Sequence, residues 1–189
     1  MIRIGILGDI GSGKSFIAKN FGYPVFNADS EVLKLYQKNK KIFFNLNKQL
    51  PNHISSYPID KTEVTKAILD NPKNLKKIIN VVHKEIRKKM NYFLKKNKNK
   101  KIVVLDIPLL LENKINSKKD ILVYVQAKKS DIEKGLRKRK NFNKKLYNKF
   151  KNIQFSSAYK KKKSNFVIKN NFEKKNVKNA IKKIINEII

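Results

Sequence analysis

Residues 8–15 of the chain read GDIGSGKS and match the pattern G-x-x-x-x-G-K-[ST]. An apolar run that contains Ile4 and Ile6 precedes them, and a short helical pattern that stops at Gly22 follows. Glycines let the main chain curl tightly, so that successive N–H groups point at phosphate oxygens. A strand, this loop and a helix in that order predict a site for a nucleoside triphosphate rather than a simple glycine-rich turn.

The residues of this loop have separate expected tasks. Lys14 should reach the β- and γ-phosphates of ATP, and the hydroxyl of Ser15 should bind Mg²⁺. The expected ATP-binding residues in this part of the chain are Gly11, Ser12, Gly13, Lys14, Ser15 and Phe16.

Length and composition limit the class of protein. The 189 residues fit one domain, and a hydrophobic content of 40% can supply a core. The absence of Cys excludes disulfides, a thiolate nucleophile and a sulfur metal site. The aliphatic runs are too short to span a bilayer, and the first run predicts a core strand rather than a signal peptide. We therefore expect a soluble protein with no membrane partner, and a dependence on ATP and Mg²⁺ favours the cytoplasm.

The formal charge of +32 suggests a nucleic-acid partner, because clustered cations neutralise phosphates. Only four of the 46 basic residues are Arg, however, and readout of bases depends strongly on the Arg side chain. Lys and Asn are enriched together, as in residues 95–101, KKNKNKK, which is typical of A/T-rich codon usage at exposed positions. We expect weak, salt-sensitive binding to polyanions and no specific nucleic-acid partner.

Short apolar runs alternate with amphipathic stretches, which is typical of helices packed on a largely parallel sheet. Strands are expected at residues 2–7, 24–27, 101–106, 121–126 and 166–168. Helices are expected at residues 15–21, 30–39, 61–69, 72–93 and 177–188, and from a cap at Ser130 toward Arg139. These patterns by themselves indicate an α/β protein with a phosphate-binding loop.

Two stretches carry weaker patterns. Residues 40–57 are expected to be irregular, with Pro51 and Pro58 as breakers. Residues 142–163 combine many lysines with a helical pattern and should form a basic lid with little buried surface.

Several motifs together resemble the dephospho-CoA kinase family. The family joins a phosphate loop to an acidic strand end, a helix that carries His, a Pro-Leu-Leu-x-Glu segment, an Arg-bearing lid and a Gln, Lys, Val-Ile and Asn series. This chain has those features at residues 8–15, Asp29, His83, residues 108–112, Arg139, Gln154, Lys160, residues 167–168 and Asn170. The similarity covers nearly the whole chain, and the segment 108–112 separates it from nucleoside monophosphate and shikimate kinases.

The resemblance implies transfer of the γ-phosphoryl group of ATP to the ribose 3′-hydroxyl of dephospho-CoA, the final step of coenzyme A biosynthesis. It implies ATP and Mg²⁺ as cofactors and dephospho-CoA as the small-molecule partner, and it leaves the oligomeric state open. We predict a three-layer α/β P-loop fold with a parallel five-stranded sheet. Its core should comprise residues 1–39 and 100–189, with a helical substrate-binding insert at about 40–96 and a lid at about 137–163.

Three candidate catalytic or metal-binding residues lie outside the loop. Asp29 is expected to accept a hydrogen bond from the attacking hydroxyl, with a helix N-cap as the alternative. Asp106 fits a role in Mg²⁺ binding as well as that of a buried carboxylate satisfied by loop amides. Arg139 is expected to clamp phosphate or stack on adenine, tasks that Lys cannot reproduce, although runs of charge are usually solvated.

The resemblance assigns His83, Leu110, Glu112 and Lys160 to the acceptor and Asn170 to ATP. His83 could instead be structural, and Glu112 could pair with a lysine. Lys160 is the first residue of a run of four lysines, and only its spacing from Gln154 distinguishes it. A zinc site is not expected, since neither His83 nor His53 has a second ligand nearby.

Asp9 departs from the family pattern, which usually has a second glycine there. Its carboxylate would repel a triphosphate unless the side chain points away. Further departures are Asn27 at a position that is often acidic, Lys84 in place of Pro, and Ser164-Asn165 in place of Ala-Asp. Two alternatives stay open, namely a kinase of another small nucleotide or metabolite and an ATPase stimulated by nucleic acid.

Overall fold

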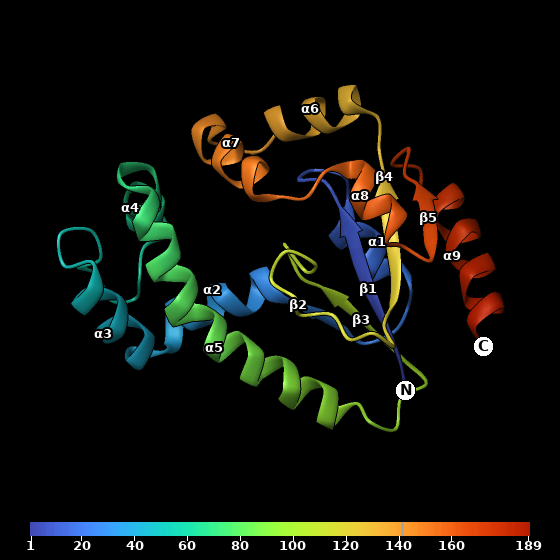
Figure 1. The fold of residues 1–189 in the computed structure, drawn as a ribbon, viewed down its shortest axis with the longest axis horizontal. Coiled ribbons are helices and arrows are strands. Elements are labelled where there is room, and N and C mark those ends of the chain that lie inside the picture. Colours follow the sequence, from blue (N-terminus) through green and yellow to red (C-terminus); the bar gives the residue numbers. More distant parts are fainter. Residues whose placement is uncertain (141) are drawn as a thin grey trace. The chain divides into compact units, whose positions relative to one another are not determined.

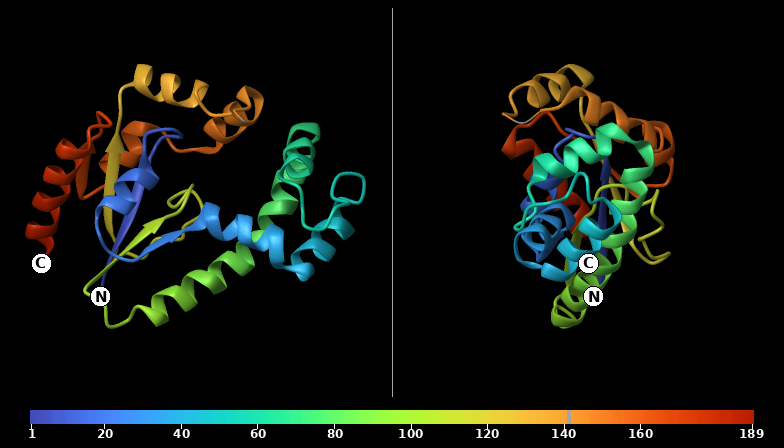
Figure 2. Two further views of the ribbon diagram at one scale, coloured as in Figure 1. Left: turned by 180° about the vertical axis from the view of Figure 1, so that it is seen from behind. Right: turned by 90° about the vertical axis from the view of Figure 1, so that its left-hand side faces the viewer.

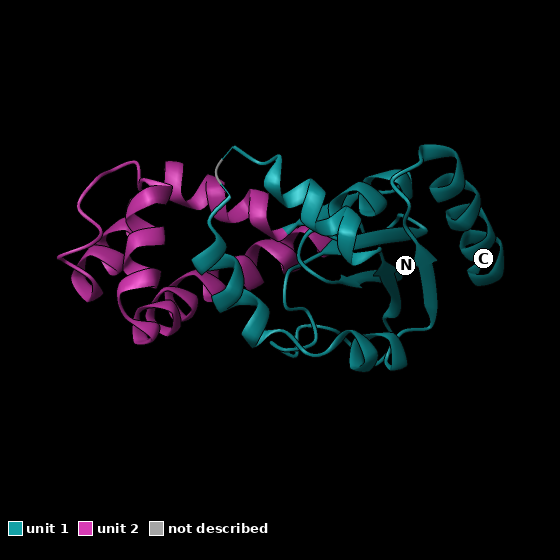
Figure 3. Ribbon diagram, turned by 90° about the horizontal axis from the view of Figure 1, so that it is seen from above, with its two compact units in different colours: residues 1–27, 97–189 teal, residues 28–96 magenta. Residues whose placement is uncertain are grey.

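The computed structural model describes residues 1–140 and 142–189. The chain divides into two compact units, one made of residues 1–27 and 97–189 and the other of residues 28–96 (Figures 1 and 3). No helix of the described part is long and apolar enough to cross a membrane.

A five-stranded parallel sheet organises the first unit. Its strands are β1 (Ile2–Gly8), β2 (Val25–Asn27), β3 (Ile102–Asp106), β4 (Ile121–Gln126) and β5 (Phe166–Lys169). They lie in the order β2-β3-β1-β4-β5, and each neighbouring pair runs parallel. The predicted parallel five-stranded sheet is therefore confirmed, and every predicted strand lies within about one residue of its observed bounds.

One face of the sheet packs against α1 (Lys14–Asn20) and α9 (Lys174–Ile188). Alternate residues of a strand point to the same face, so that Ile4 and Ile6 of β1 reach Ile17 of α1 and Val177 of α9 in one fully buried cluster. Figures 1 and 2 show α8 (Ser157–Lys162) on the opposite face of the sheet from α1.

Gly5 permits a close approach on that second face. A Cβ atom at this position would lie 2.7 Å from Cδ2 of Leu110 and 2.9 Å from Cδ2 of Leu122. The segment that follows β3 therefore lies directly over β1, and the side chain of Leu110, with 1% exposure, belongs to the interior.

The remaining helices of this unit are α6 (Lys129–Arg137) and α7 (Lys144–Ile153). The expected cap at Ser130 was wrong, because Ser130 lies inside α6 and Lys128 precedes the helix without a side-chain cap. The expectation of little buried surface is confirmed for α7, which has no buried residue. In α8 the one buried residue is Lys160, which is 2% exposed.

The second unit consists of α2 (Ala28–Lys38), α3 (Lys40–Gln49), α4 (Lys61–Asp70) and α5 (Pro72–Lys96), and α5 contacts each of the others. Residues 40–49 were expected to be irregular and are helical. Asn39 caps this helix, since its side chain accepts a hydrogen bond of 3.1 Å from the N–H of Ile42. Ile42 and Leu46, one turn apart, are both fully buried.

Candidate active site

The phosphate loop, residues 8–15, joins β1 to α1. Gly13 has a φ of +90°, and a Cβ atom there would collide with Nδ2 of Asn170, so that this position requires glycine. Nδ2 of Asn170 donates to the carbonyl of Ser12 at 2.8 Å, and its Oδ1 accepts from the N–H of Phe172 at 2.9 Å. The Asn170 side chain, expected to bind ATP, is buried and supports the main chain of the loop.

Lys14 lies over the first half of the loop. Its Nζ donates to the carbonyl of Asp9 at 2.8 Å and to that of Gly8 at 3.1 Å. Ser15, in the first turn of α1, is exposed, whereas Phe16 is partly buried against the core. The loop thus offers an ammonium group and an accessible hydroxyl.

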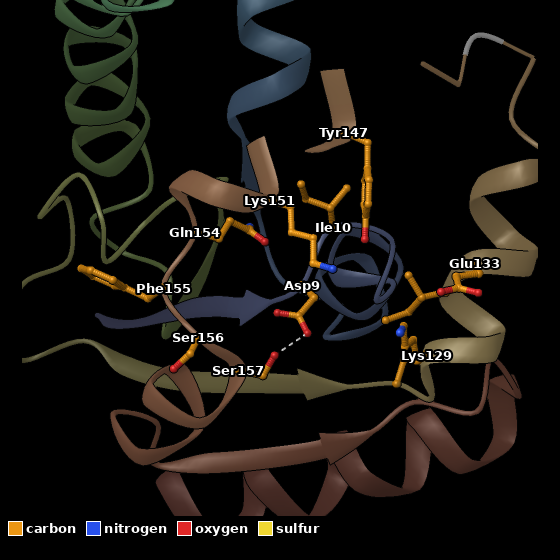
Figure 4. A pocket seen from close by; sticks show the side chains of 12 residues that line it. Asp9, Ile10, Lys129, Glu133, Tyr147, Lys151, Gln154, Phe155, Ser156 and Ser157 are labelled. Atoms are coloured by element: carbon orange, nitrogen blue, oxygen red, sulfur yellow. Dashed lines mark hydrogen bonds between the residues drawn. The ribbon is translucent and has the colours of Figure 1, made fainter. Parts of the chain in front are cut away.

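Asp9 forms an ion pair with Lys160 of α8. Its Oδ1 accepts a hydrogen bond of 2.6 Å from Nζ of Lys160. Its Oδ2 accepts one of 2.7 Å from Oγ of Ser157 (Figure 4). Burial raises the pKa of Asp9, but these hydrogen bonds and the charges of Lys160 and Lys14 outweigh it, so that the pKa lies below its ordinary value. The departure at Asp9 therefore places an ionised and paired carboxylate at the loop.

A pocket of about 420 Å³ borders the loop at Asp9 and Ile10. Its other walls come from α6, α7 and the residues that join α7 to α8 (Figure 4). These walls present Lys129, Glu133, Tyr147, Lys151 and Gln154. Arg139 does not line this pocket and is exposed two residues beyond α6.

A second, small pocket brings several predicted site residues together. It is lined by residues from the end of β1, α1, the segment after β3, the connection between α7 and α8, and α8, among them Gly8, Lys14, Leu110, Glu112, Gln154 and Lys160. Oε1 of Glu112 accepts a hydrogen bond of 2.9 Å from the N–H of Phe155. Glu112 therefore binds the main chain between α7 and α8, a role that the sequence did not predict.

The ends of β2 and β3 bring Asn27 and Asp106 into register. Asp106 is 3% exposed, and its Oδ2 accepts a hydrogen bond of 2.5 Å from Nδ2 of Asn27. Within residues 1–140 and 142–189, no group of three or more His, Asp or Glu side chains could hold a metal ion. The partner of the buried carboxylate is thus the side-chain amide of Asn27 in β2 and not an amide of the loop, as one expected reading of Asp106 had it.

Two predicted site residues belong to the second unit. Asp29 is the second residue of α2, inside the first turn and not at the N-cap position. His83 lies in α5 and is half-buried. Burial and the charge of Arg87, one turn further on, lower the pKa of His83, so that its imidazole is neutral at neutral pH.

Sequence reasoning missed the contact of Asp9 with Ser157 and Lys160. These residues follow Asp9 by 148 and 151 positions, so no local spacing connects them. The one signal in the sequence that pointed to these contacts was the carboxylate of Asp9 itself, because a carboxylate at this loop needs a cation nearby.

Comparison with known proteins identifies similar chains. The family model for dephospho-CoA kinase matches residues 2–176. The dephospho-CoA kinase of Wolbachia sp. subsp. Brugia malayi (strain TRS) is 34% identical over 190 residues, which cover 98% of this chain and 97% of that protein.

Two solved structures share the fold. TT1252 from Thermus thermophilus is similar with a TM-score of 0.81 and 26% identity, covering 100% of this chain and 98% of that one. A dephospho-CoA kinase from Campylobacter jejuni is similar with a TM-score of 0.62 and 23% identity, covering 98% and 96%.

Proposed function

The chain belongs to the dephospho-CoA kinase family, and on this basis we propose that it transfers the γ-phosphoryl group of ATP to the ribose 3′-hydroxyl of dephospho-CoA. The products would be CoA and ADP, which makes the reaction the final step of coenzyme A biosynthesis. The observation that carries the proposal is the phosphate loop, with left-handed Gly13 and Lys14 over its carbonyls.

Phosphoryl transfer requires mainly positioning and neutralisation of charge, because the transferred group spreads its charge over three oxygens. Main-chain amides of residues 11–16 and the ammonium of Lys14 are suited to hold the triphosphate. The hydroxyl of Ser15 and the carboxylate of Asp106 are oxygen donors of the kind that Mg²⁺ takes. When bound there, the ion would neutralise charge on the phosphates.

The proposed roles toward the acceptor follow from membership of the family. Asp29 accepts a hydrogen bond from the attacking hydroxyl and orients that oxygen toward the γ-phosphorus. His83, Leu110 and Glu112 contact the acceptor, and Lys160 contacts it at the hydroxyl that receives the phosphoryl group. Leu110 can do so only where it lines the small pocket, since it is otherwise buried. Arg139, exposed beyond α6, binds the phosphates or the adenine of ATP from the lid.

Mass spectrometry tests the proposal directly. Pure protein is incubated with ATP, Mg²⁺ and dephospho-CoA, and the acceptor is expected to gain one phosphoryl group. The matched control is Lys14→Ala, in which the gain should be absent over the time in which the unchanged protein completes the reaction. Release of ADP without a change in the acceptor would contradict the assignment, and its stimulation by DNA or RNA would favour an ATPase.

Competition between acceptors in one coupled ADP-release assay adds a second test. Dephospho-CoA should outcompete nucleoside monophosphates and other small alcohols. A better acceptor among them would identify a different small-molecule kinase.

A further inference from the structure

We propose that Asp9 is a positioning residue, which holds the buried ammonium group of Lys160 at the phosphate loop so that Lys160 contacts the transferred phosphoryl group. The inference rests on the proposed function and deepens it. It also reverses the simplest expectation for Asp9, because a carboxylate beside a polyphosphate is repulsive when no cation accompanies it.

The first support is the burial of Lys160. Its side chain is 3% exposed, and its Nζ lies 2.6 Å from Oδ1 of Asp9. A buried ammonium group is costly unless a carboxylate or other acceptors compensate for the lost water. Asp9 provides this compensation, and it thereby determines where the charge of Lys160 lies.

The second support is that Asp9 is itself fixed. Oγ of Ser157 donates to its carboxylate at 2.7 Å, while its carbonyl accepts from the N–H of Ser12 at 3.1 Å and from Nζ of Lys14 at 2.8 Å. The orientation of the Lys160 ammonium therefore follows from the conformation of the phosphate loop.

The third support is the convergence of two cations. Lys14 donates to the carbonyl of Asp9 and Lys160 to its carboxylate, and both line the small pocket together with Gly8. The phenol of Tyr124 is hydrogen-bonded with Ser157, which also contacts Asp9. Burial and the charge of Asp9 raise the pKa of Tyr124 above its ordinary value, so that Tyr124 adds no charge there. A phosphate at the loop would therefore meet a second ammonium group besides that of Lys14.

Steady-state kinetics with ATP as the varied substrate tests the inference in four variants. These are Asp9→Asn, Lys160→Met, the double variant and Lys161→Met, the last being an exposed neighbour in α8 that loses the same charge. Asp9→Asn should lower kcat about tenfold or more, although it removes a negative charge from beside the phosphates. Lys160→Met should lower kcat at least as much, and Lys161→Met should leave it unchanged.

The decisive measurement is the effect of Asp9→Asn in the Lys160→Met background. If Asp9 acts through Lys160, the substitution should no longer lower kcat and should increase ATP affinity, since an unpaired carboxylate has been removed. A gain in kcat from Asp9→Asn in the otherwise unchanged protein would overturn the inference. So would losses in the two single variants that simply multiply in the double variant.

Folding is controlled by thermal denaturation of each variant. If Asp9→Asn does not fold, Ser157→Ala removes one anchor of Asp9 without leaving Lys160 unpaired. It should lower kcat several-fold in the otherwise unchanged protein and have no effect beside Lys160→Met, while the same loss in both backgrounds would refute the inference.

Titration with ATP and Mg²⁺ separates this inference from the proposed function, because it requires no acceptor. The Kd for ATP should rise in Lys160→Met, and Asp9→Asn should raise it in the unchanged protein but lower it beside Lys160→Met. If dephospho-CoA proved not to be the acceptor, this reversal of sign would still support the role of Asp9, and its absence would reject it.

Discussion

The two compact units hold their proposed site residues by different means. In the first unit, Lys14 and Glu112 are fixed by hydrogen bonds with main-chain groups, and the Asp9 carboxylate by those from Lys160 and Ser157. In the second unit, Asp29 and His83 occupy positions on helices whose placement depends on a hydrophobic core. A substitution in the first unit should therefore change the binding of phosphate by removing a known hydrogen bond. A substitution in the second unit should show whether the residue affects kcat or only the stability of its helix.

Asp29→Asn should have the largest effect. Loss of the hydrogen-bond acceptor for the attacking hydroxyl should lower kcat by about 10²–10⁴-fold, with little change in the KM for ATP. Kinetics and thermal denaturation are measured on the same sample. A fall in melting temperature at normal kcat would show that Asp29 serves only the helix, and the second unit would then contribute no catalytic group.

Lys14→Ala should follow. Removal of the ammonium group that stabilises the phosphates should lower kcat by about 10²–10³-fold and weaken ATP binding, while the fold is retained. The readouts are product formation and an ATP titration, with circular dichroism as the check on folding. Normal turnover would show that Lys14 and the phosphate loop take no part in catalysis. The comparison between the two units would then lose its basis.

Arg139→Lys should have a smaller effect that sharpens the comparison within the first unit. Arg139 is exposed and does not line the large pocket, so only its contacts to bound ATP are lost. We expect the KM for ATP to rise about tenfold, because Lys keeps the charge but not the fork of donors. Unaltered kinetics would show that the lid requires only a cation at this position.

His83 should produce the smallest effect, and it concerns stability. Because burial and the charge of Arg87 lower the pKa of His83, the unfolded chain binds a proton more readily than the folded one. Stability should therefore fall as the pH drops below the ordinary value of about 6.5 and through the lowered pKa. The melting temperature should fall from pH 7.5 to pH 5.5. This fall should be smaller in His83→Gln than in the unchanged protein, by less than about 2 °C. An equal or larger fall would place the titration elsewhere.

The sheet could be predicted from the sequence because its strands are buried on both faces and appear as continuous apolar runs. Ile102 to Leu105 are each fully buried in β3, as the run predicted. The phosphate loop was equally accessible to prediction, since the positive φ of Gly11 and Gly13 is a local demand that the glycine pattern itself reveals.

The parts that could not be predicted depend on contacts between distant segments. The helix α3 was hidden because Pro51 suggested a break, although it follows the end of the helix and the Ile42–Leu46 stripe is short. The burial of Lys160 depends on Asp9, which lies 151 residues away, and no periodicity encodes such a pair. The bond from Phe155 to Glu112 is hidden for the same reason.

Residues 160–163 are four consecutive lysines that look interchangeable in the sequence, yet Lys160 is enclosed while the other three are open to solvent. A genome whose base composition favours lysine codons could add or discard the open three freely. The enclosed one cannot be lost in the same way, because its loss would leave the carboxylate of Asp9 without its cation. Amine-reactive reagents should label Lys161, Lys162 and Lys163 quickly and Lys160 slowly, which would make the difference in accessibility measurable for each side chain.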